Sequence, residues 1–317
     1  MRAVLLDQQT FSNKLSFSAI SACVSSWQSY ATTKESEVVE RCRDYEIIIT
    51  NKVVLSAQIL KQLSQLKLIC VAATGYNNVD IEAASALGIA VTNVSGYSQS
   101  SVSQYVFAQI LEYYSQTSHH NHNVETGLWQ QSATFCLHGN GSQELAGKKI
   151  GIIGYGSLGK RVAQIAKAFD MEVLIAERQG AKTLRANRQD FEQVLKQADI
   201  ISLHCPQTND TTAMVDTRFL SLMQPSAMLI NTARGPLVKN QDLLNALTNK
   251  EIAYAVLDVL EQEPPSPEHI LLKQQLPNLK ITAHIAWASD ESQQRLIDLI
   301  AQNIQSFTKG EKLNRIN

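Results

Sequence analysis

Residues 149–159 read KIGIIGYGSLG, an apolar run that leads into three spaced glycines, Gly154, Gly156 and Gly159. An amphipathic stretch follows, and an acidic residue, Glu177, ends the next apolar run. Glycines in this pattern allow a tight turn, a close approach of the backbone to a pyrophosphate and close packing of helix on strand. The free N–H groups at the start of the helix can bind phosphate. This stretch therefore predicts a dinucleotide-binding βαβ unit.

The acid at the end of the second apolar run indicates which dinucleotide is bound. A carboxylate at Glu177 can accept hydrogen bonds from the ribose hydroxyls and repels a 2′-phosphate, which favours NAD. Arg178 follows it directly and could meet a 2′-phosphate, so NADP remains the less favoured cofactor.

Short apolar runs alternate with longer amphipathic stretches along most of the chain. This rhythm is typical of parallel sheets covered on both faces by helices. Six of the runs follow residue 148, the number of strands in a full dinucleotide-binding domain. The expected strands are 3–7, 46–50, 68–72, 89–92, 149–154, 172–177, 199–204, 227–231, 253–258 and 280–284.

The length of 317 residues is too great for one ordinary core, so we expect two domains. A helical stretch at 98–116 precedes a polar region, 115–143, which is expected to be a loop that connects the domains. A single helix, 291–308, follows the last strand and must bury its apolar face on the first domain. The predicted domains are residues 1–97 with 286–317, for the substrate, and residues 98–285, for the dinucleotide.

Charge and cysteine content argue against several classes of function. The 28 basic and 29 acidic residues nearly balance, which disfavours a broad nucleic-acid surface or a polybasic membrane anchor, and no apolar run could span a bilayer. The five cysteines include no CxxC pair, so we expect reduced thiols in a cytoplasmic protein. His119, His120 and His122 lack the spacing and partner ligands of a helical zinc site, so no metal is expected.

Polar residues follow three of the late apolar runs. Arg234, Asp258, Glu263 and His284 should converge, because ligand sites of parallel sheets lie at the carboxyl ends of the strands. Any one of these residues alone is more often structural than catalytic. Together, behind a dinucleotide loop, they indicate a catalytic site.

These segments resemble the D-2-hydroxy acid dehydrogenase family, and more narrowly its glycerate dehydrogenase (hydroxypyruvate reductase) branch, over almost the whole chain. The loops AATGYNNVD at 72–80 and NVSGY at 93–97 look like those of the substrate domain of that branch, and HIAWAS at 284–289 is similar to its tail motif. The resemblance implies an α/β protein with two doubly wound parallel-sheet domains. One would be a Rossmann NAD-binding domain and the other a discontinuous flavodoxin-like substrate domain. It also implies a homodimer formed through the dinucleotide domain and residues 98–143.

The activity that the resemblance implies is hydride transfer between NADH and a small 2-keto acid, most specifically hydroxypyruvate to D-glycerate and also glyoxylate to glycolate. Arg234 would bind the substrate carboxylate and polarise the carbonyl. His284 would exchange a proton with the carbonyl oxygen, while Glu263 would hold the tautomer of His284 and favour its protonated form. Asp258 would contact the nicotinamide amide.

Further contacts follow from the same resemblance. Backbone N–H groups of Thr74, Gly75 and Tyr76 would hold the substrate carboxylate from the other domain. The remaining cofactor contacts would come from the glycine loop, from the acid after the second strand and from Ser157, Leu158, His204, Cys205, Pro206, Thr211, Thr232, Ala233, Arg234 and His284.

The chain departs from the family pattern at three positions. Ala283 stands where Pro often precedes the catalytic His, Tyr105 where the branch often has His, and His138 where related enzymes often have an aromatic residue. One alternative is a dehydrogenase for another 2-keto acid, such as pyruvate, a branched-chain acid or phosphohydroxypyruvate. The other is an NAD-responsive co-regulator binding protein of the same fold, which the complete catalytic set disfavours.

Overall fold

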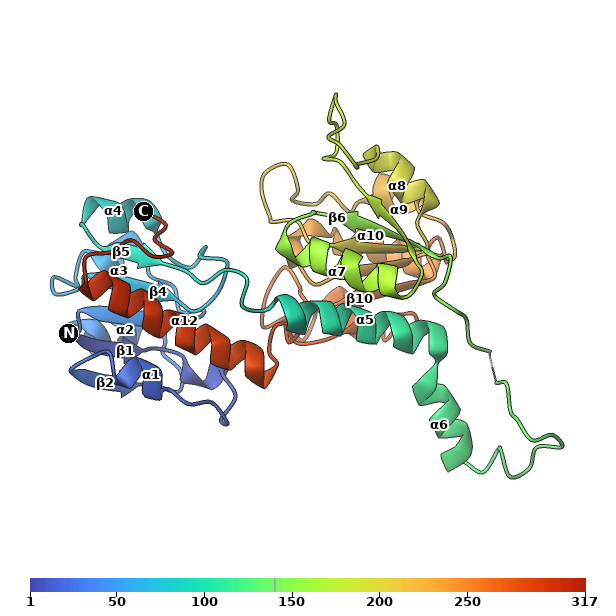
Figure 1. Cartoon of the computed structure of the whole chain (residues 1–317), viewed down its shortest axis with the longest axis horizontal. Helices are drawn as coiled ribbons and strands as arrows, with labels where there is room; N and C mark the ends of the chain where they lie inside the picture. The colour runs from blue at the N-terminus through green and yellow to red at the C-terminus, as the bar shows by residue number, and fades with distance from the viewer. Residues whose placement is uncertain (140) are drawn as a thin grey trace. The chain divides into compact units, whose positions relative to one another are not determined.

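The computed structural model describes residues 1–139 and 141–317, and the chain forms two compact units (Figure 1). Unit 1 comprises Met1–Ser98 and Trp287–Asn317, and unit 2 comprises Gln99–Ala286. Each unit contains one parallel sheet with helices around it. The α/β class with two parallel sheets, predicted from the alternation of apolar runs, is confirmed.

Unit 1 has a five-stranded parallel sheet in the order β2-β1-β3-β4-β5, which is the flavodoxin-like order. The apolar pattern predicts four of these strands and misses β2. This edge strand reads SWQS and alternates exposed with half-buried residues, so it carries no apolar run. The strands are β1 (Arg2–Leu5), β2 (Ser26–Ser29), β3 (Ile47–Thr50), β4 (Leu68–Val71) and β5 (Ala90–Thr92).

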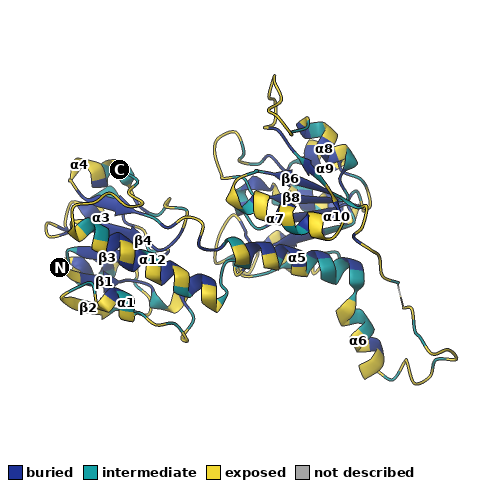
Figure 2. Cartoon of the chain, in the orientation of Figure 1, coloured by how far each residue is buried: buried dark blue, intermediate teal, exposed yellow. Residues whose placement is uncertain are grey.

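Helices cover both faces of this sheet. The long helix α12 (Asp290–Thr308) has apolar residues three or four positions apart, and these are buried with α1 on one face (Figure 2). The other face packs against α2, α3 and α4. The bounds of the remaining helices in unit 1 are η1 (Gln8–Thr10), α1 (Ser18–Ser21), η2 (Glu35–Glu37), α2 (Val38–Cys42), α3 (Ala57–Leu60) and α4 (Ile81–Ala86).

Unit 2 has a six-stranded parallel sheet in the order β11-β10-β9-β8-β6-β7. A parallel bridge between Ala176 and Gln189 continues the sheet beyond β7, so the order is that of a Rossmann domain whose third strand is reduced to one bridge. The strands are β6 (Lys149–Ile153), β7 (Glu172–Ile175), β8 (Ile200–Leu203), β9 (Met228–Asn231), β10 (Tyr254–Leu257) and β11 (Leu279–Ile281). All six late strands that the sequence predicts are present.

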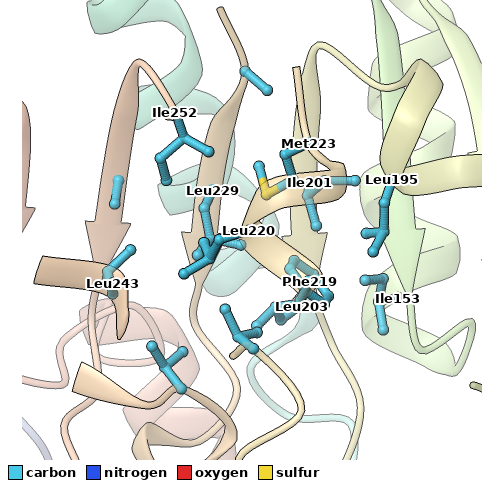
Figure 3. Packing of buried hydrophobic residues seen from close by; sticks show 14 of the residues in the cluster. Ile153, Leu195, Ile201, Leu203, Phe219, Leu220, Met223, Leu229, Leu243 and Ile252 are labelled. Carbon is cyan, nitrogen blue, oxygen red and sulfur yellow. The ribbon is translucent and has the colours of Figure 1, made fainter. Parts of the chain in front are cut away.

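Four helices of unit 2, α8 to α11, bury one face of this sheet in a large apolar core, part of which Figure 3 shows. There, Leu195 of α8 and Phe219 and Leu220 of α9 pack toward Ile201, Leu203 and Leu229 of the sheet. Helix α7 packs beside α5 (Figure 1). The helices are α5 (Gln99–Ser115), α6 (Thr117–Glu125), α7 (Ser157–Ala168), α8 (Phe191–Gln197), α9 (Thr217–Leu222), η3 (Gly235–Leu237), α10 (Asn240–Thr248) and α11 (Ile270–Lys273).

The polar region 115–143 differs from the prediction of a loop between domains. It lies within unit 2, and its first part is helix α6, which extends away from the sheet of that unit (Figure 1). A left-handed Gln116, with φ of 50°, separates α6 from α5. The helix is mostly polar, so it lacks the apolar stripe on which the prediction depends. Asn140, part of the predicted loop, lies outside the described residues. None of the helices described is long and apolar enough to cross a membrane.

Candidate active site

The three glycines of the phosphate loop have different steric reasons to be glycine. Gly154 has φ of 94°, and a Cβ there would lie 2.4 Å from the backbone nitrogen of Cys205. A Cβ on Gly159 would lie 2.2 Å from the carbonyl oxygen of Gly154, so only glycine lets α7 start this close to β6. A Cβ on Gly156 would meet no atom within 4 Å. The open space above Gly156, at the N-cap of α7, fits the close approach of a pyrophosphate to the helix N-terminus.

A pocket of about 720 Å³ opens beside this loop, within unit 2. Its volume is in the range of ligand sites, and it is lined by the loop, the end of β7 and the segment after β8. The predicted cofactor residues that line it are Gly154, Gly156, Glu177, His204, Cys205, Pro206 and Thr211. Burial raises the pKa of the Cys205 thiol, which agrees with a pocket wall and not with a nucleophile.

Two buried polar atoms, just after the ends of β8 and β9, have no partner among the described residues. They are Nδ1 of His204 and Oγ1 of Thr232. Burial lowers the pKa of His204 to about 4, so the imidazole is neutral near pH 7. Its Nε2 is 2.9 Å from the hydroxyl of Ser202. Unpartnered buried polar groups are costly in a protein without a ligand. The residues present therefore fit a bound dinucleotide.

Glu177, predicted to bind the ribose hydroxyls, is held by an arginine that no sequence pattern marks. Its side chain is only 3% exposed and forms an ion pair with Arg185, whose Nε lies 2.8 Å from Oε2. This arginine and the backbone N–H of Arg178 hold the pKa of the Glu177 carboxyl well below its usual range. A basic residue eight positions after the acid is a weak signal, because the loop between them has no regular period.

Arg234 follows β9, on a loop whose conformation is fixed from both sides. The amide of Asn231, the last residue of β9, donates to the carbonyl of Arg234 (2.8 Å) and accepts from the N–H of Ala233 (3.0 Å). Gly235 comes next, and a Cβ there would lie 1.9 Å from the backbone carbon of Leu260. The loop that carries Arg234 thus packs directly on the loop after β10, which carries Glu263.

Glu263 and His284 form a close pair. Nδ1 of His284 lies 2.6 Å from Oε2 of Glu263, and the other carboxylate oxygen accepts from the N–H of Leu260 at 3.0 Å. Both side chains are about one-third exposed, at 27% and 34%. The carboxylate fixes the proton on Nδ1, which leaves Nε2 of His284 available to a ligand.

Asp258 acts in this structure by holding the turn that carries His284. Its carboxylate accepts hydrogen bonds from the hydroxyl of Thr282 (2.6 Å) and from the N–H groups of Ile285 and Ala286 (both 2.9 Å). His284 itself has φ of 52° and donates its N–H to the carbonyl of Asp258 (2.8 Å). These bonds constrain the turn in which Ala283 precedes His284.

Tyr105 extends this network to helix α5. Its hydroxyl lies 2.6 Å from that of Thr282, which donates to Asp258. Tyr105 and Thr282 thus help to hold the turn that carries His284. The sequence hints at Tyr105 only through its departure from the family pattern, and it gives no sign of Thr282.

The structure pairs Glu263 with His284 and places Arg234 on the neighbouring loop, since the three residues follow the adjacent strands β10, β11 and β9. Thr74, Gly75 and Tyr76 belong to unit 1 and follow β4. Their three N–H groups donate to no acceptor within the described chain, while Oγ1 of Thr74 donates to the carbonyl of Val94 (3.0 Å). These N–H groups are therefore available to a ligand.

Residues 107–286 match the family described as D-isomer specific 2-hydroxyacid dehydrogenase, NAD binding domain. A glycerate dehydrogenase from Methylorubrum extorquens is 42% identical over 284 residues, which cover 90% of this chain and 89% of that protein. A hydroxypyruvate reductase from Blautia hydrogenotrophica is 35% identical over 288 residues, with 90% and 89% covered.

A solved structure of an acyclic imino acid reductase, in complex with NADPH and D-Arg, superposes with a TM-score of 0.85 at 27% identity and covers 100% of both chains. The matched family domain confirms NAD as the cofactor that the glycine loop and Glu177 predict. The chain is an oxidoreductase that belongs to the D-isomer specific 2-hydroxyacid dehydrogenase family.

Proposed function

We propose that this protein reduces small 2-keto acids to D-2-hydroxy acids with NADH, with hydroxypyruvate as the best substrate and glyoxylate as the second. The observation that carries the proposal is the His284–Glu263 pair, 2.6 Å apart, at the carboxyl ends of strands in the same sheet whose strand β6 leads into the dinucleotide loop. Relatives named glycerate dehydrogenase, hydroxypyruvate reductase and glyoxylate reductase support this choice of substrates.

Two side chains of the protein, Arg234 and His284, would act on the substrate beside the bound cofactor. Bound NADH supplies the hydride. Arg234 donates one Nη1 hydrogen to the carbonyl of Ala233 and keeps its other donors for the planar carboxylate and carbonyl oxygen of the substrate. His284, oriented by Glu263, gives the proton from Nε2 to the carbonyl oxygen and takes it back in the reverse direction.

The cofactor and the substrate carboxylate would be held mostly by backbone groups. Gly156, Ser157 and Leu158 would bind the pyrophosphate at the start of α7. The unpartnered hydroxyl of Thr232 would bind the nicotinamide half, next to Ala233. The free N–H groups of Thr74–Tyr76 would bind the substrate carboxylate. Asp258 would act mainly through His284, because three donors of residues 282–286 already occupy its carboxylate.

We also propose a homodimer formed through residues 98–143. The segment from α6 onward exposes large apolar side chains, with Phe135 at 91% and Trp129 at 49%. Side chains of this size exposed on one segment are typical of a surface that another chain covers.

We also propose that the protein is cytoplasmic. Its five cysteines are all free, which suits the reducing conditions of the cytoplasm.

The test of the substrate proposal is NADH oxidation with an equimolar panel of hydroxypyruvate, glyoxylate, pyruvate, 2-ketoisocaproate and phosphohydroxypyruvate. We expect the highest kcat/KM for hydroxypyruvate, a lower value for glyoxylate and D-glycerate as the product. A higher kcat/KM for a branched-chain or phosphorylated acid would contradict the choice of substrate, and turnover of none of them would contradict the enzyme assignment.

A further inference from the structure

The carboxylate of Glu177 is saturated by donors of the protein itself. Its Oε1 accepts from the N–H of Arg178 (2.8 Å) and from Nε (3.1 Å) and Nη2 of Arg185. Its Oε2 accepts from the N–H and Nε of Arg185, at 3.1 and 2.8 Å. A carboxylate has about four acceptor sites, so little capacity remains for the two ribose hydroxyls.

The pairing also changes the charge that a nucleotide meets in this pocket. Glu177 alone would repel a 2′-phosphate, but the guanidinium of Arg185 forms an ion pair with it and neutralises its negative charge. The lowered pKa of Glu177 means that the carboxylate stays ionised near pH 7, so the pair persists there. The side chain of Arg185 is 54% exposed, and its Nη1 donates to no atom of the described residues.

Two more arginines line the same pocket, and the guanidinium of one of them forms no ion pair among the described residues. Arg188 donates Nη1 to the carbonyl of Ala176 (3.0 Å) and lies over the ring of Tyr155. The guanidinium of Arg178 forms no ion pair within the part of the chain described. The pocket thus holds three arginines against two carboxylates, Glu177 and Asp210, which is an excess of positive charge at its adenosine end.

We infer that Arg185 determines the cofactor specificity of this protein. By neutralising Glu177 and presenting free N–H donors, Arg185 lets the ribose pocket accept a 2′-phosphate, so that NADP(H) serves as a second, weaker cofactor beside NAD(H). Arg178 assists as the second donor to the phosphate. This inference concerns the nucleotide pocket alone and is independent of which keto acid the protein reduces.

The experiment measures binding of two adenosine fragments, 5′-AMP and 2′,5′-ADP, by calorimetry, so it does not depend on turnover. In the wild type, we expect 2′,5′-ADP to bind within about tenfold of 5′-AMP, because charge-assisted bonds offset the repulsion. In Arg185→Leu, the bare Glu177 carboxylate faces the phosphate. Affinity for 2′,5′-ADP should fall by at least about tenfold, while affinity for 5′-AMP stays within about threefold.

Arg218→Leu is the matched control. It removes an arginine of the same unit that pairs with Glu192 and does not line the pocket. This variant should change neither affinity by more than about twofold. Equal loss of both fragments in Arg185→Leu would overturn the inference, because it would show that Arg185 only supports the loop. Unchanged binding of 2′,5′-ADP in that variant, or wild-type protein that binds 5′-AMP but no 2′,5′-ADP, would overturn it as well.

Discussion

Some residues of the candidate active site act by holding another residue in position. His284 has the left-handed backbone that a non-glycine residue rarely adopts, and the carboxylate of Asp258 fixes the turn around it. The sequence predicts Asp258 as a ligand contact, because it follows a strand. It does not predict that the carboxylate is occupied by residues 282–286, since these bonds depend on how β10 and β11 pair.

A partly buried histidine in the nucleotide pocket makes the stability of the protein depend on pH. Burial lowers the pKa of His204 to about 4 from 6.5. Between these values the unfolded chain binds a proton at this residue and the folded protein does not, so stability is lost as the pH falls through this window. The lost free energy of unfolding should approach about 3 kcal/mol at the lower end.

His204→Gln tests this dependence by urea unfolding at pH 7, 5.5 and 4.5. The difference in free energy of unfolding between wild type and variant should move in favour of the variant as the pH falls. A constant difference for His204→Gln would contradict the role of its burial.

The elements of the fold were predictable where their burial is continuous. Strands such as β8 and β9, buried at every position, give unbroken apolar runs, and the sequence places them within a residue or two. Strand β2 and helix α6 are half-exposed, so their sequences are too polar to show the apolar pattern that predicts a strand or a helix. The same limit applies to the site: Arg185 and Thr282 matter through tertiary contacts, and no local pattern marks such contacts.

Two glycines of the phosphate loop are expected to affect different properties. Gly156 should matter for cofactor binding and Gly159 for stability. Gly156→Ala places a methyl group in open space, so the free energy of unfolding should change by less than about 1 kcal/mol. The same methyl group would lie where the pyrophosphate approaches, and affinity for NADH should fall by at least about tenfold. Gly159→Ala forces a methyl group against the carbonyl of Gly154 and should cost about 2–4 kcal/mol of stability.

Urea unfolding and titration of NADH fluorescence measure the two properties separately. The expected pattern is a stable Gly156→Ala protein with weak cofactor binding and an unstable Gly159→Ala protein. A Gly156→Ala protein that binds NADH as the wild type does would show that the pyrophosphate does not lie over this residue.

For the whole molecule, the exposed apolar side chains after α6 predict the assembly state. Replacing Trp129 and Phe135 together by serine should convert a dimer to a monomer at micromolar concentration, because apolar contact area of this kind stabilises dimers. Sedimentation velocity measures the mass directly. Leu87→Ser, which changes an exposed apolar residue of unit 1, should leave the dimer intact. A wild-type protein that sediments as a monomer would contradict the proposed interface.

Both units place their candidate ligand groups after the carboxyl ends of parallel strands. Thr74–Tyr76 follow β4 in unit 1, and Arg234, Glu263 and His284 follow three adjacent strands in unit 2. The glycine loop alone indicates only a nucleotide. The chemistry assigned to the whole molecule depends on His284 as the group that moves the proton.

The most direct test of that claim is the rate of NADH oxidation by His284→Asn with saturating hydroxypyruvate. The account predicts a kcat at least about 100-fold below the wild-type value, because a general acid contributes this much, and an unchanged dissociation constant for NADH. A kcat within about threefold of the wild type would contradict the assignment of His284 as proton donor.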